Sequence, residues 1–128
     1  MIVLMDTQAL LWRVEDSPRL SPSARAIISD PSNHALYSVA SLWEITIKVG
    51  LGKLETKEPL DVLFSRMESR APHLRLPLLT PHFLEYAKLP HHHRDPFDRM
   101  IIAQALSESL IVVGSDDAFD AYGVQRIW

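Results

Sequence analysis

Short apolar runs alternate along the chain with segments whose apolar residues follow a helical period. Two runs, Ile2–Met5 and Leu110–Val113, are apolar at every position, which is typical of strands buried on both faces of a sheet. Leu60, Leu63 and Phe64 show the second pattern, which places them on one face of a helix. Since such strands and helices take turns along the sequence, we predict an α/β fold in which helices cover both faces of a mostly parallel sheet.

Prolines and glycines mark the ends of several helices. Pro22, Pro81 and Pro96 suit the first turn of a helix, and Gly50 and Gly52 suit the end of one. We therefore expect helices over residues 7–14, 21–29, 39–49, 59–70, 80–88, 96–109 and 117–122, with further short strands over 35–38, 73–76 and 124–128. The sequence shows no repeat and no low-complexity linker, so we expect a single domain over residues 1–128.

The composition narrows the class of protein. Apolar residues make up 47% of the chain and charged residues 23%, as in an ordinary globular domain. The apolar runs are far shorter than the roughly 20 residues that a membrane-spanning helix needs. The chain has no cysteine, which excludes disulfides, thiolate zinc sites and a cysteine nucleophile. Because no stretch has the character of a signal peptide, we expect a cytoplasmic protein with no membrane contact.

Two aspartates follow the two clearest strands. Asp6 comes directly after the first strand, and Asp116 comes after the second one and Gly114-Ser115. Because the carboxyl ends of neighbouring parallel strands meet at one edge of a sheet, we expect these two carboxylates to share a crevice there. The alternative is structural, since each aspartate is also placed to cap the helix that follows it.

A third acid, Glu44, lies in a predicted helix that is apolar almost all round. Such a helix is buried, and a buried carboxylate needs a partner or a metal ion. Two local partners offer an alternative explanation. Ser41 and Glu44 have the spacing of a capping box, and Lys48 is placed for an ion pair one turn further on.

The fourth acid, Asp98, lies at the start of the predicted helix over 96–109. Asp95 is suited to cap this helix, which puts Asp98 in its first turn, where the helix dipole favours a negative charge. Asp98 also shares a stripe with the apolar Ile102, so it extends from the side that faces the core. An acid that only stabilises the helix dipole would not need to extend from the side of the helix that faces the core.

Four carboxylates that converge from four elements favour one kind of chemistry. Clustered carboxylates raise one another's pKa unless a cation neutralises them, and hard oxygen ligands select Mg²⁺ or Mn²⁺. Such ions activate water for the hydrolysis of phosphodiester bonds. Thirteen basic and sixteen acidic residues give a net charge of −3 without any basic tract, so contact with nucleic acid would have to be local.

These residues, in this order, resemble the PIN-domain family, and within it the VapC-like toxin ribonucleases of bacterial toxin–antitoxin pairs. The matching segments are Met5–Trp12, Ser38–Ile45, Lys48–Leu54, His93–Ala105, and Asp116 with Ala118 and Phe119. The resemblance implies an α/β/α sandwich, endonucleolytic cleavage of RNA with Mg²⁺ or Mn²⁺, a cognate antitoxin and a homodimer. It identifies the acidic quartet of the family with Asp6, Glu44, Asp98 and Asp116.

The resemblance also suggests roles for two neighbouring residues. Thr7 matches the hydroxyl residue that often follows the first acid. Where many members have a threonine two residues before the last acid, this chain has Gly114, and Ser115 beside it is a candidate substitute. By its position next to the presumed metal site, rather than by the resemblance, Arg99 is a candidate to hold a substrate phosphate, with a surface ion pair as the alternative.

The remaining polar and aromatic candidates have simpler explanations. His91, His92 and His93 are consecutive, so they cannot all reach one ion, and we interpret them as a solvated loop, with contact to RNA as the alternative. Trp12 and Trp43 have apolar neighbours, which favours contacts in the core or in a dimer over stacking on bases.

Two other functions compete with a nuclease. The first is a catalytically silent PIN-like binding module, which the unusual Gly114 leaves open. The second is a phosphoacceptor receiver domain, which needs an acceptor aspartate after a central strand and a lysine after a later strand. Here Asp61 falls within a predicted helix and no lysine follows Val113, so this function fits poorly.

Overall fold

The computed structural model describes residues 1–70 and 74–128. Five strands form one sheet in the order β3-β2-β1-β4-β5, and every neighbouring pair is parallel. The predicted parallel sheet is therefore confirmed. The strands are β1 (Ile2–Met5), β2 (His34–Ser38), β3 (Arg75–Leu76), β4 (Ile111–Val113) and β5 (Arg126–Ile127).

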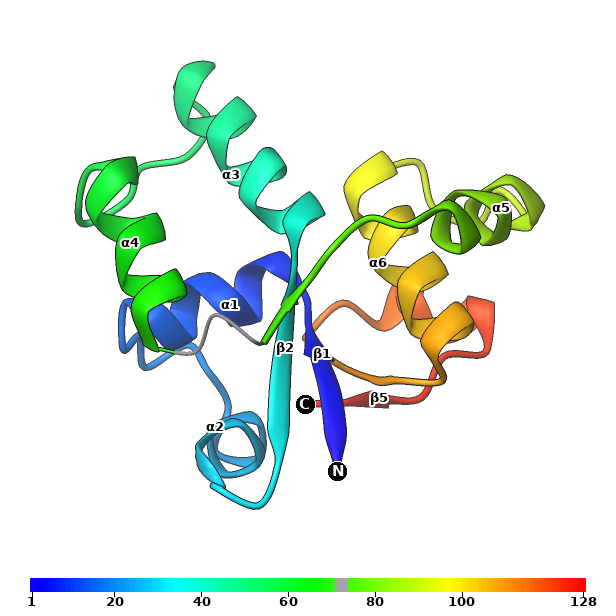
Figure 1. Ribbon diagram of the computed structural model, residues 1–128, viewed down its shortest axis with the longest axis horizontal. Helices are drawn as coiled ribbons and strands as arrows, with labels where there is room; N and C mark the ends of the chain where they lie inside the picture. The colour runs from blue at the N-terminus through cyan, green and yellow to red at the C-terminus, as the bar shows by residue number, and fades with distance from the viewer. Residues whose placement is uncertain (71–73) are drawn as a thin grey trace.

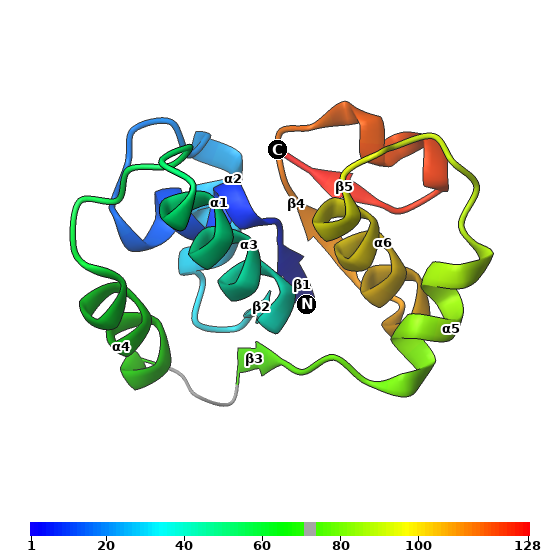
Figure 2. The same cartoon turned by 90° about the horizontal axis from the view of Figure 1, so that it is seen from above.

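Helices lie on both sides of this sheet, as predicted. Figure 1 shows α1, α2 and α4 on one side of the strands and α5 and α6 on the other, and Figure 2 gives the same arrangement from above. In the described ranges, no helix is long and apolar enough to cross a membrane. The helices are α1 (Thr7–Val14), α2 (Pro22–Ser29), α3 (Val39–Gly50), α4 (Leu60–Arg70), α5 (Thr80–Lys88) and α6 (Pro96–Glu108), with a 3₁₀ helix, η2 (Asp117–Tyr122).

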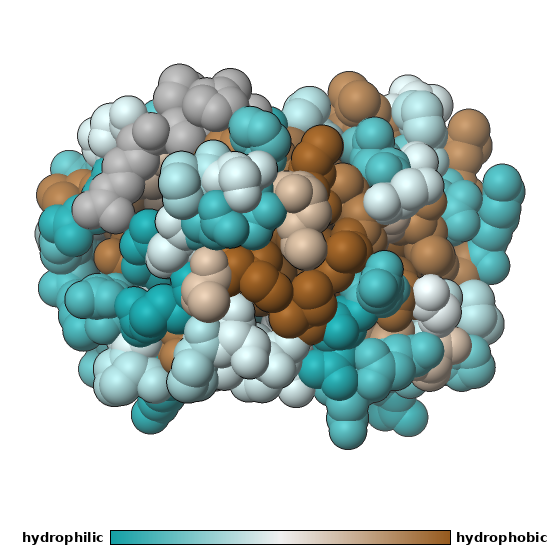
Figure 3. All heavy atoms as spheres, turned by 90° about the horizontal axis from the view of Figure 1, so that it is seen from below, coloured by the Kyte–Doolittle hydropathy of each residue, from teal (hydrophilic) through white to brown (hydrophobic). Residues whose placement is uncertain are grey.

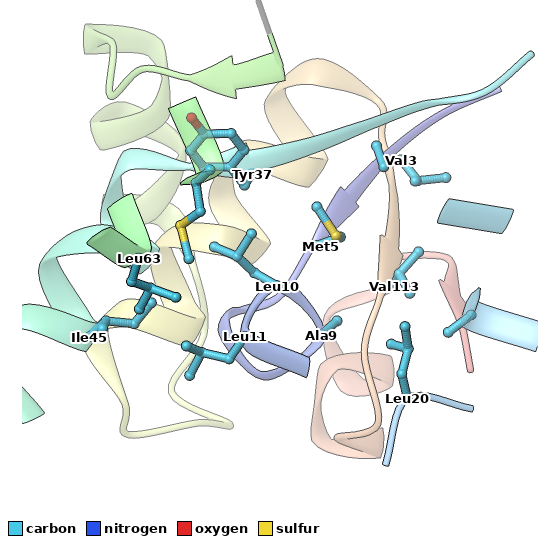
Figure 4. Packing of buried hydrophobic residues seen from close by; sticks show 13 residues of the cluster. Val3, Met5, Ala9, Leu10, Leu11, Leu20, Tyr37, Ile45, Leu63 and Val113 are labelled. Atoms are coloured by element: carbon cyan, nitrogen blue, oxygen red, sulfur yellow. The ribbon is translucent and has the colours of Figure 1, made fainter. Parts of the chain in front are cut away.

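Strand β1 supplies side chains to two separate cores. Val3 and Met5 belong to the cluster that they form with Leu10 of α1 (Figure 4), whereas Leu4 packs in a second cluster with Ile102 of α6. All five residues are at most 5% exposed. A strand that is covered on both faces must be apolar at every position, which explains its sequence and holds β1 at the centre of the sheet.

The observed elements differ from the predicted ones mainly at the edges of the sheet. Strand β3 covers only residues 75–76 of the predicted 73–76, and residue 73 lies outside the described residues. Strand β5 covers 126–127 of the predicted 124–128. Each of these strands has one neighbour in the sheet, and edge strands are commonly short. The segment over 117–122 is helical as predicted, but it forms a 3₁₀ helix.

The register of β1 determines where the site lies. Met5 pairs with Tyr37 of β2 and with Val113 of β4, and the Asp6 N–H donates to the Val113 carbonyl oxygen at 3.0 Å. The three central strands therefore end side by side, and the residues that follow them emerge at one edge. At the opposite edge, where Ile2 is 50% exposed, apolar side chains gather on the surface (Figure 3).

Candidate active site

Asp6 follows β1 and caps α1. Its Oδ1 accepts a hydrogen bond from the Ala9 N–H at 2.8 Å, and the residue is 5% exposed. Burial is the main cause that raises the pKa of Asp6 to about 6; the Ala9 hydrogen bond opposes the rise, and repulsion from Glu44 and Asp116 adds to it. The capping role is thus confirmed, and it uses one carboxylate oxygen while leaving Oδ2 for the site.

Glu44 lies in α3 with its carboxylate buried at 4% exposure. The Thr7 hydroxyl donates to Oε1 at 2.7 Å and lies 2.9 Å from the Ser41 hydroxyl oxygen. Lys48 Nζ is 2.5 Å from Oε2, so the predicted ion pair is confirmed. The alternative of a capping box is wrong, because Ser38 caps α3 and Ser41 lies inside the helix.

Asp98 lies in the first turn of α6, as predicted. Asp95 caps this helix by accepting hydrogen bonds from the N–H groups of Phe97 and Asp98. Burial is the main cause that raises the pKa of Asp98 to about 7, and repulsion from Asp95, Glu44 and Asp6 adds to it. Asp6 and Asp98 therefore lie close enough to repel one another, on the same side of the molecule.

Asp116 follows β4 and caps the short helix η2. Its Oδ1 accepts from the Ala118 N–H at 2.9 Å, while its Oδ2 faces His93 Nε2 at 3.3 Å. The side chain is 44% exposed, which makes it the most open of the four acids. Because Asp116 contributes to the raised pKa of Asp6, the acids of β1 and β4 share one electrostatic environment.

His93 is a site residue that sequence reasoning missed. Its Nε2 lies 3.1 Å from Asp98 Oδ2 as well as 3.3 Å from Asp116 Oδ2. His91 and His92 are exposed, as a solvated loop predicts, but His93 turns inward. The only signal in the sequence was the position of His93 five residues before Asp98, and that spacing alone does not tell which of three consecutive histidines faces the site.

Of the three accessory residues, Thr7 reaches the site through its hydrogen bond to Glu44. Arg99 does not agree with the expected phosphate contact, because it is 5% exposed and donates to the backbone carbonyl oxygen of Pro90 at 2.8 Å. Its guanidinium also lies over the ring of Tyr86 at 5.0 Å. Arg99 therefore holds the histidine loop in place. Ser115 is exposed, and its role stays a prediction.

Gly114 is buried against Asp6. A Cβ atom on residue 114 would lie 2.4 Å from Asp6 Oδ2 and 2.8 Å from its Cγ, well inside van der Waals contact. Residue 114 therefore has a local reason to lack a side chain. In this chain the carboxylate of Asp6 occupies the space that a side chain on residue 114 would need.

An apolar groove of 260 Å³ lies between α3, α5 and α6, and two of its lining residues, Trp43 and Phe97, directly precede Glu44 and Asp98 in the chain. Trp43, Phe83, Phe97 and Met100 are among its lining residues. Trp43 is 59% exposed and packs edge to face on Phe97, with ring centroids 5.3 Å apart. For Trp43 the core alternative is thus wrong and a contact in a dimer stays a prediction, whereas Trp12 is partly buried against the core.

The acids fit a divalent cation. They come from four different elements, and burial and mutual repulsion raise the pKa of both Asp6 and Asp98. A cation held between them would reverse that effect, because it favours the charged carboxylates. His93, Asp98 and Asp116 also place one potential ligand atom each within 4.8 Å of one another. Carboxylates arranged in this way can hold an ion and orient water beside it.

Comparisons with known proteins identify relatives of this fold. The model of the PIN domain family matches residues 3–125. The structure resembles FitAcB from Neisseria gonorrhoeae, with a TM-score of 0.67 and 25% identity over 100% of this chain and 97% of that one. It also resembles VapBC2 from Rickettsia felis bound to a promoter DNA fragment, with a TM-score of 0.71 and 16% identity over 100% of this chain and 99% of that one. A third similar structure is VapBC-5 from Mycobacterium tuberculosis, with a TM-score of 0.63 and 24% identity over 98% of this chain and 97% of that one. The search of curated proteins found no significant match.

Proposed function

Because the chain belongs to the PIN domain family, we propose that it is a metal-dependent endoribonuclease and the toxin of a toxin–antitoxin pair. One observation carries the proposal. Asp6, Glu44, Asp98 and Asp116 converge at the carboxyl edge of the sheet, and the raised pKa values of Asp6 and Asp98 reflect carboxylates that are buried near one another. Burial and mutual repulsion make such a cluster of charged carboxylates unfavourable unless a cation joins it.

The four acids have different proposed roles, which follow from their burial and their hydrogen-bond partners. Asp6 and Asp98 are best placed to hold Mg²⁺ or Mn²⁺. The cap of α1 uses only Oδ1 of Asp6, and Asp95 rather than Asp98 supplies the cap of α6. Glu44, fixed by Thr7 and Lys48, and the more open Asp116 complete the site or orient water. The ion, when bound, supplies an activated water and stabilises the leaving oxygen. We expect no covalent intermediate, because the proposed nucleophile is water.

A polar groove beside the acids supports RNA as the substrate. It has a volume of 580 Å³ and is lined by Tyr86, His91, His93, Arg94 and Arg99. Arg94 and His91 are exposed and can meet phosphate oxygens, whereas Arg99 is buried in the loop. Local cations of this kind allow a chain with a net charge of −3 to bind a polyanion. An RNA substrate also agrees with the expected cytoplasmic location.

The apolar groove at Trp43 and Phe97 supports the antitoxin as a partner. Exposed apolar surface next to an active site is typical of a surface that another protein covers. FitAcB and the two VapBC structures carry the names of both members of a pair, so the relatives were solved as assemblies. We propose that a segment of the antitoxin covers this groove and blocks access to the acids.

A homodimer is the second assembly that the family resemblance implies. We propose it without assigning its surface. Light scattering on the purified chain, with the antitoxin absent and present, measures the mass of each assembly directly. A mass of two chains in the absence of antitoxin supports the dimer, and a mass of one chain contradicts it.

Cleavage of single-stranded RNA tests the proposed activity. The parent chain is expected to cut a labelled RNA with Mn²⁺ and to stop when EDTA is added. Asp98→Asn removes one charge at the site, and the matched control Asp61→Asn removes one from an exposed position on α4. We expect the first variant to be inactive and the second to match the parent. Full activity of Asp98→Asn would contradict the proposal, and a parent that binds RNA without cutting it would favour the silent binding module.

A further inference from the structure

The inward-facing histidine of the loop is held at both its backbone groups and both its ring nitrogens. The His93 N–H donates to the Tyr122 hydroxyl oxygen at 2.7 Å, and the His93 carbonyl oxygen accepts from Arg99 at 3.4 Å. In the ring, Nδ1 accepts from the Asp95 N–H at 3.1 Å and Nε2 faces Asp116. A solvated loop residue has no need of such contacts, so the structure fixes this ring against the acids.

The contacts of the ring also determine which nitrogen carries the proton. Because Nδ1 accepts from a backbone N–H, it cannot carry a proton itself, and the proton of the neutral imidazole then lies on Nε2. That nitrogen is 3.3 Å from Asp116 Oδ2 in hydrogen-bond geometry and 3.1 Å from Asp98 Oδ2. If Nε2 carried no proton, its lone pair would face two carboxylate oxygens, which is unfavourable. A protonated Nε2 instead donates to Asp116 and places a partial positive charge beside Asp98.

Asp116 is the acid that most needs such a partner. Its side chain is 44% exposed and follows β4 in a short loop, and the cap on the Ala118 N–H engages only Oδ1. Without a donor on Oδ2, this carboxylate is free to turn towards solvent and away from Asp98. The loop that carries His93 is itself fixed by the buried Arg99, so the position of the donor does not depend on substrate.

We propose that His93 is a positioning residue of the acidic site, acting as a hydrogen-bond donor that holds Asp116 beside Asp98. The inference rests on the proposed function, because the two carboxylates matter as a pair only when they share an ion. In this role His93 is not a metal ligand, since a nitrogen that carries a proton has no lone pair to offer. It is not an RNA contact either, since its N–H is already engaged.

The protonation pattern of the ring is the first test. Long-range ¹H–¹⁵N spectra of the parent, recorded without divalent ions at a pH where histidines are neutral, report which ring nitrogen carries the proton. The signals of His93 are assigned by their loss in His93→Gln. We expect the proton on Nε2. A proton on Nδ1 would overturn the proposal, because the Asp95 N–H could not then donate to this ring.

The affinity for Mn²⁺ alone, measured by calorimetry, is the second test. His93→Ala is expected to bind Mn²⁺ about tenfold more weakly than the parent, as for other residues that orient metal ligands. His93→Gln is expected to keep most of the affinity, because its amide N–H reaches the same place as Nε2–H. The matched control is His92→Ala, which removes an exposed neighbour and should bind like the parent.

Each alternative role predicts a different result. Unchanged Mn²⁺ affinity in His93→Ala would overturn the proposal, and a raised KM for RNA with that affinity unchanged would identify a substrate contact instead. An equal loss in folded His93→Gln and His93→Ala would exclude a donor role. If His93→Ala does not fold, the spectra and the glutamine variant decide. Neither test uses RNA. A parent that fails to cut RNA therefore refutes the proposed function, while the spectra and the Mn²⁺ affinities still decide the inference about His93.

Discussion

The backbone of Gly114 lies directly against the carboxylate of Asp6. A Cβ on residue 114 would meet Asp6 Oδ2 at 2.4 Å, and both residues come from the ends of adjacent strands whose register pairs Met5 with Val113. The backbone that follows β4 therefore limits the positions that the Asp6 carboxylate can take. Asp6 has its place because the residue that follows β4 has no side chain.

Gly114→Ala should damage the site more than the fold. The added methyl group must push the Asp6 carboxylate away, and a displacement of about 1 Å in a catalytic group costs on the order of a hundredfold in rate. We expect kcat/KM for RNA to fall by about that factor and Mn²⁺ binding to weaken with it. Kinetic assays and calorimetry on the same protein preparation measure both effects.

Gly50→Ala is the matched control for that variant. It adds the same methyl group at the end of α3, where no neighbouring atom lies within 4 Å of the added Cβ. It should keep Mn²⁺ affinity close to that of the parent. The explanation of Gly114 fails if Gly114→Ala binds Mn²⁺ as tightly as Gly50→Ala does.

Thr7→Val should weaken activity through Glu44. Valine has nearly the shape of threonine but lacks the hydroxyl that donates to Glu44 Oε1 at 2.7 Å, so the glutamate loses one of its two fixed contacts. We expect about a tenfold loss in metal affinity or in kcat, as for other groups that orient a metal-site carboxylate. Thr46→Val on the exposed side of α3 makes the same chemical change at a distance, and it should leave both quantities unchanged. Equal behaviour of the two variants would show that Thr7 has no role in the site.

The stability of the metal-free chain should fall as the pH rises from 5 to 8. The folded state raises the pKa of Asp6 to about 6 and that of Asp98 to about 7, above the values near 4 of an unfolded chain. Between these limits the folded state binds more protons than the unfolded one. The contribution of these two protonated carboxyl groups to the free energy of unfolding is therefore complete at low pH, and it is lost as the pH rises through 6 and 7. Thermal melts in EDTA measure the trend.

Two changes should remove that trend. Added Mn²⁺ favours the charged carboxylates, so it should raise the melting temperature most at pH 8. Asp6→Asn keeps an oxygen for the Ala9 cap and carries no charge, so its melting temperature in EDTA should depend less on pH. A parent whose melting temperature rises with pH in EDTA would show that these acids are not held in a desolvated cluster.

Arg99→Met should reduce stability more than Arg94→Met. Arg99 is buried and donates to the Tyr122 hydroxyl oxygen at 3.2 Å and to the Leu89 carbonyl oxygen at 3.5 Å, so its removal leaves buried acceptors without this partner. Such a loss typically costs about 3 kcal/mol of the free energy of unfolding. Arg94 is exposed, and its removal should change stability by less than about 0.5 kcal/mol. Urea unfolding of both variants gives the comparison. Similar values for the two would mean that Arg99 does not anchor the loop.

Patterns of short range predicted most of the fold. An all-apolar strand such as Ile2–Met5 needs cover on two faces, and that requirement alone indicates a central parallel strand. Proline at the start of α6 and Asp95 before it placed Asp98 in the first turn. Sequence therefore placed Asp6, Asp98 and Asp116, because each one follows a strand or lies at the start of a helix. Glu44 lies inside α3, and only its place in an almost wholly apolar helix marked it as a candidate.

Contacts between distant segments could not be predicted in the same way. The inward turn of His93 depends on Tyr122 and Asp116, which lie more than 20 residues further along the chain. The exposure of Trp43 depends on how α3 meets α5 and α6, and a helix that is apolar almost all round does not reveal which face stays open. Each of these features is set by tertiary packing and leaves no local pattern.

Binding of Mn²⁺ to the purified chain tests the central claim most directly, since every role assigned to the acids requires them to hold one divalent site. Calorimetry should show binding to the parent and to Asp61→Asn, and a loss of at least about tenfold in affinity in Asp6→Asn and in Asp98→Asn. Neither asparagine variant should unfold the chain, because each one removes a charge whose burial is unfavourable. Undiminished Mn²⁺ affinity in both Asp6→Asn and Asp98→Asn would contradict the account.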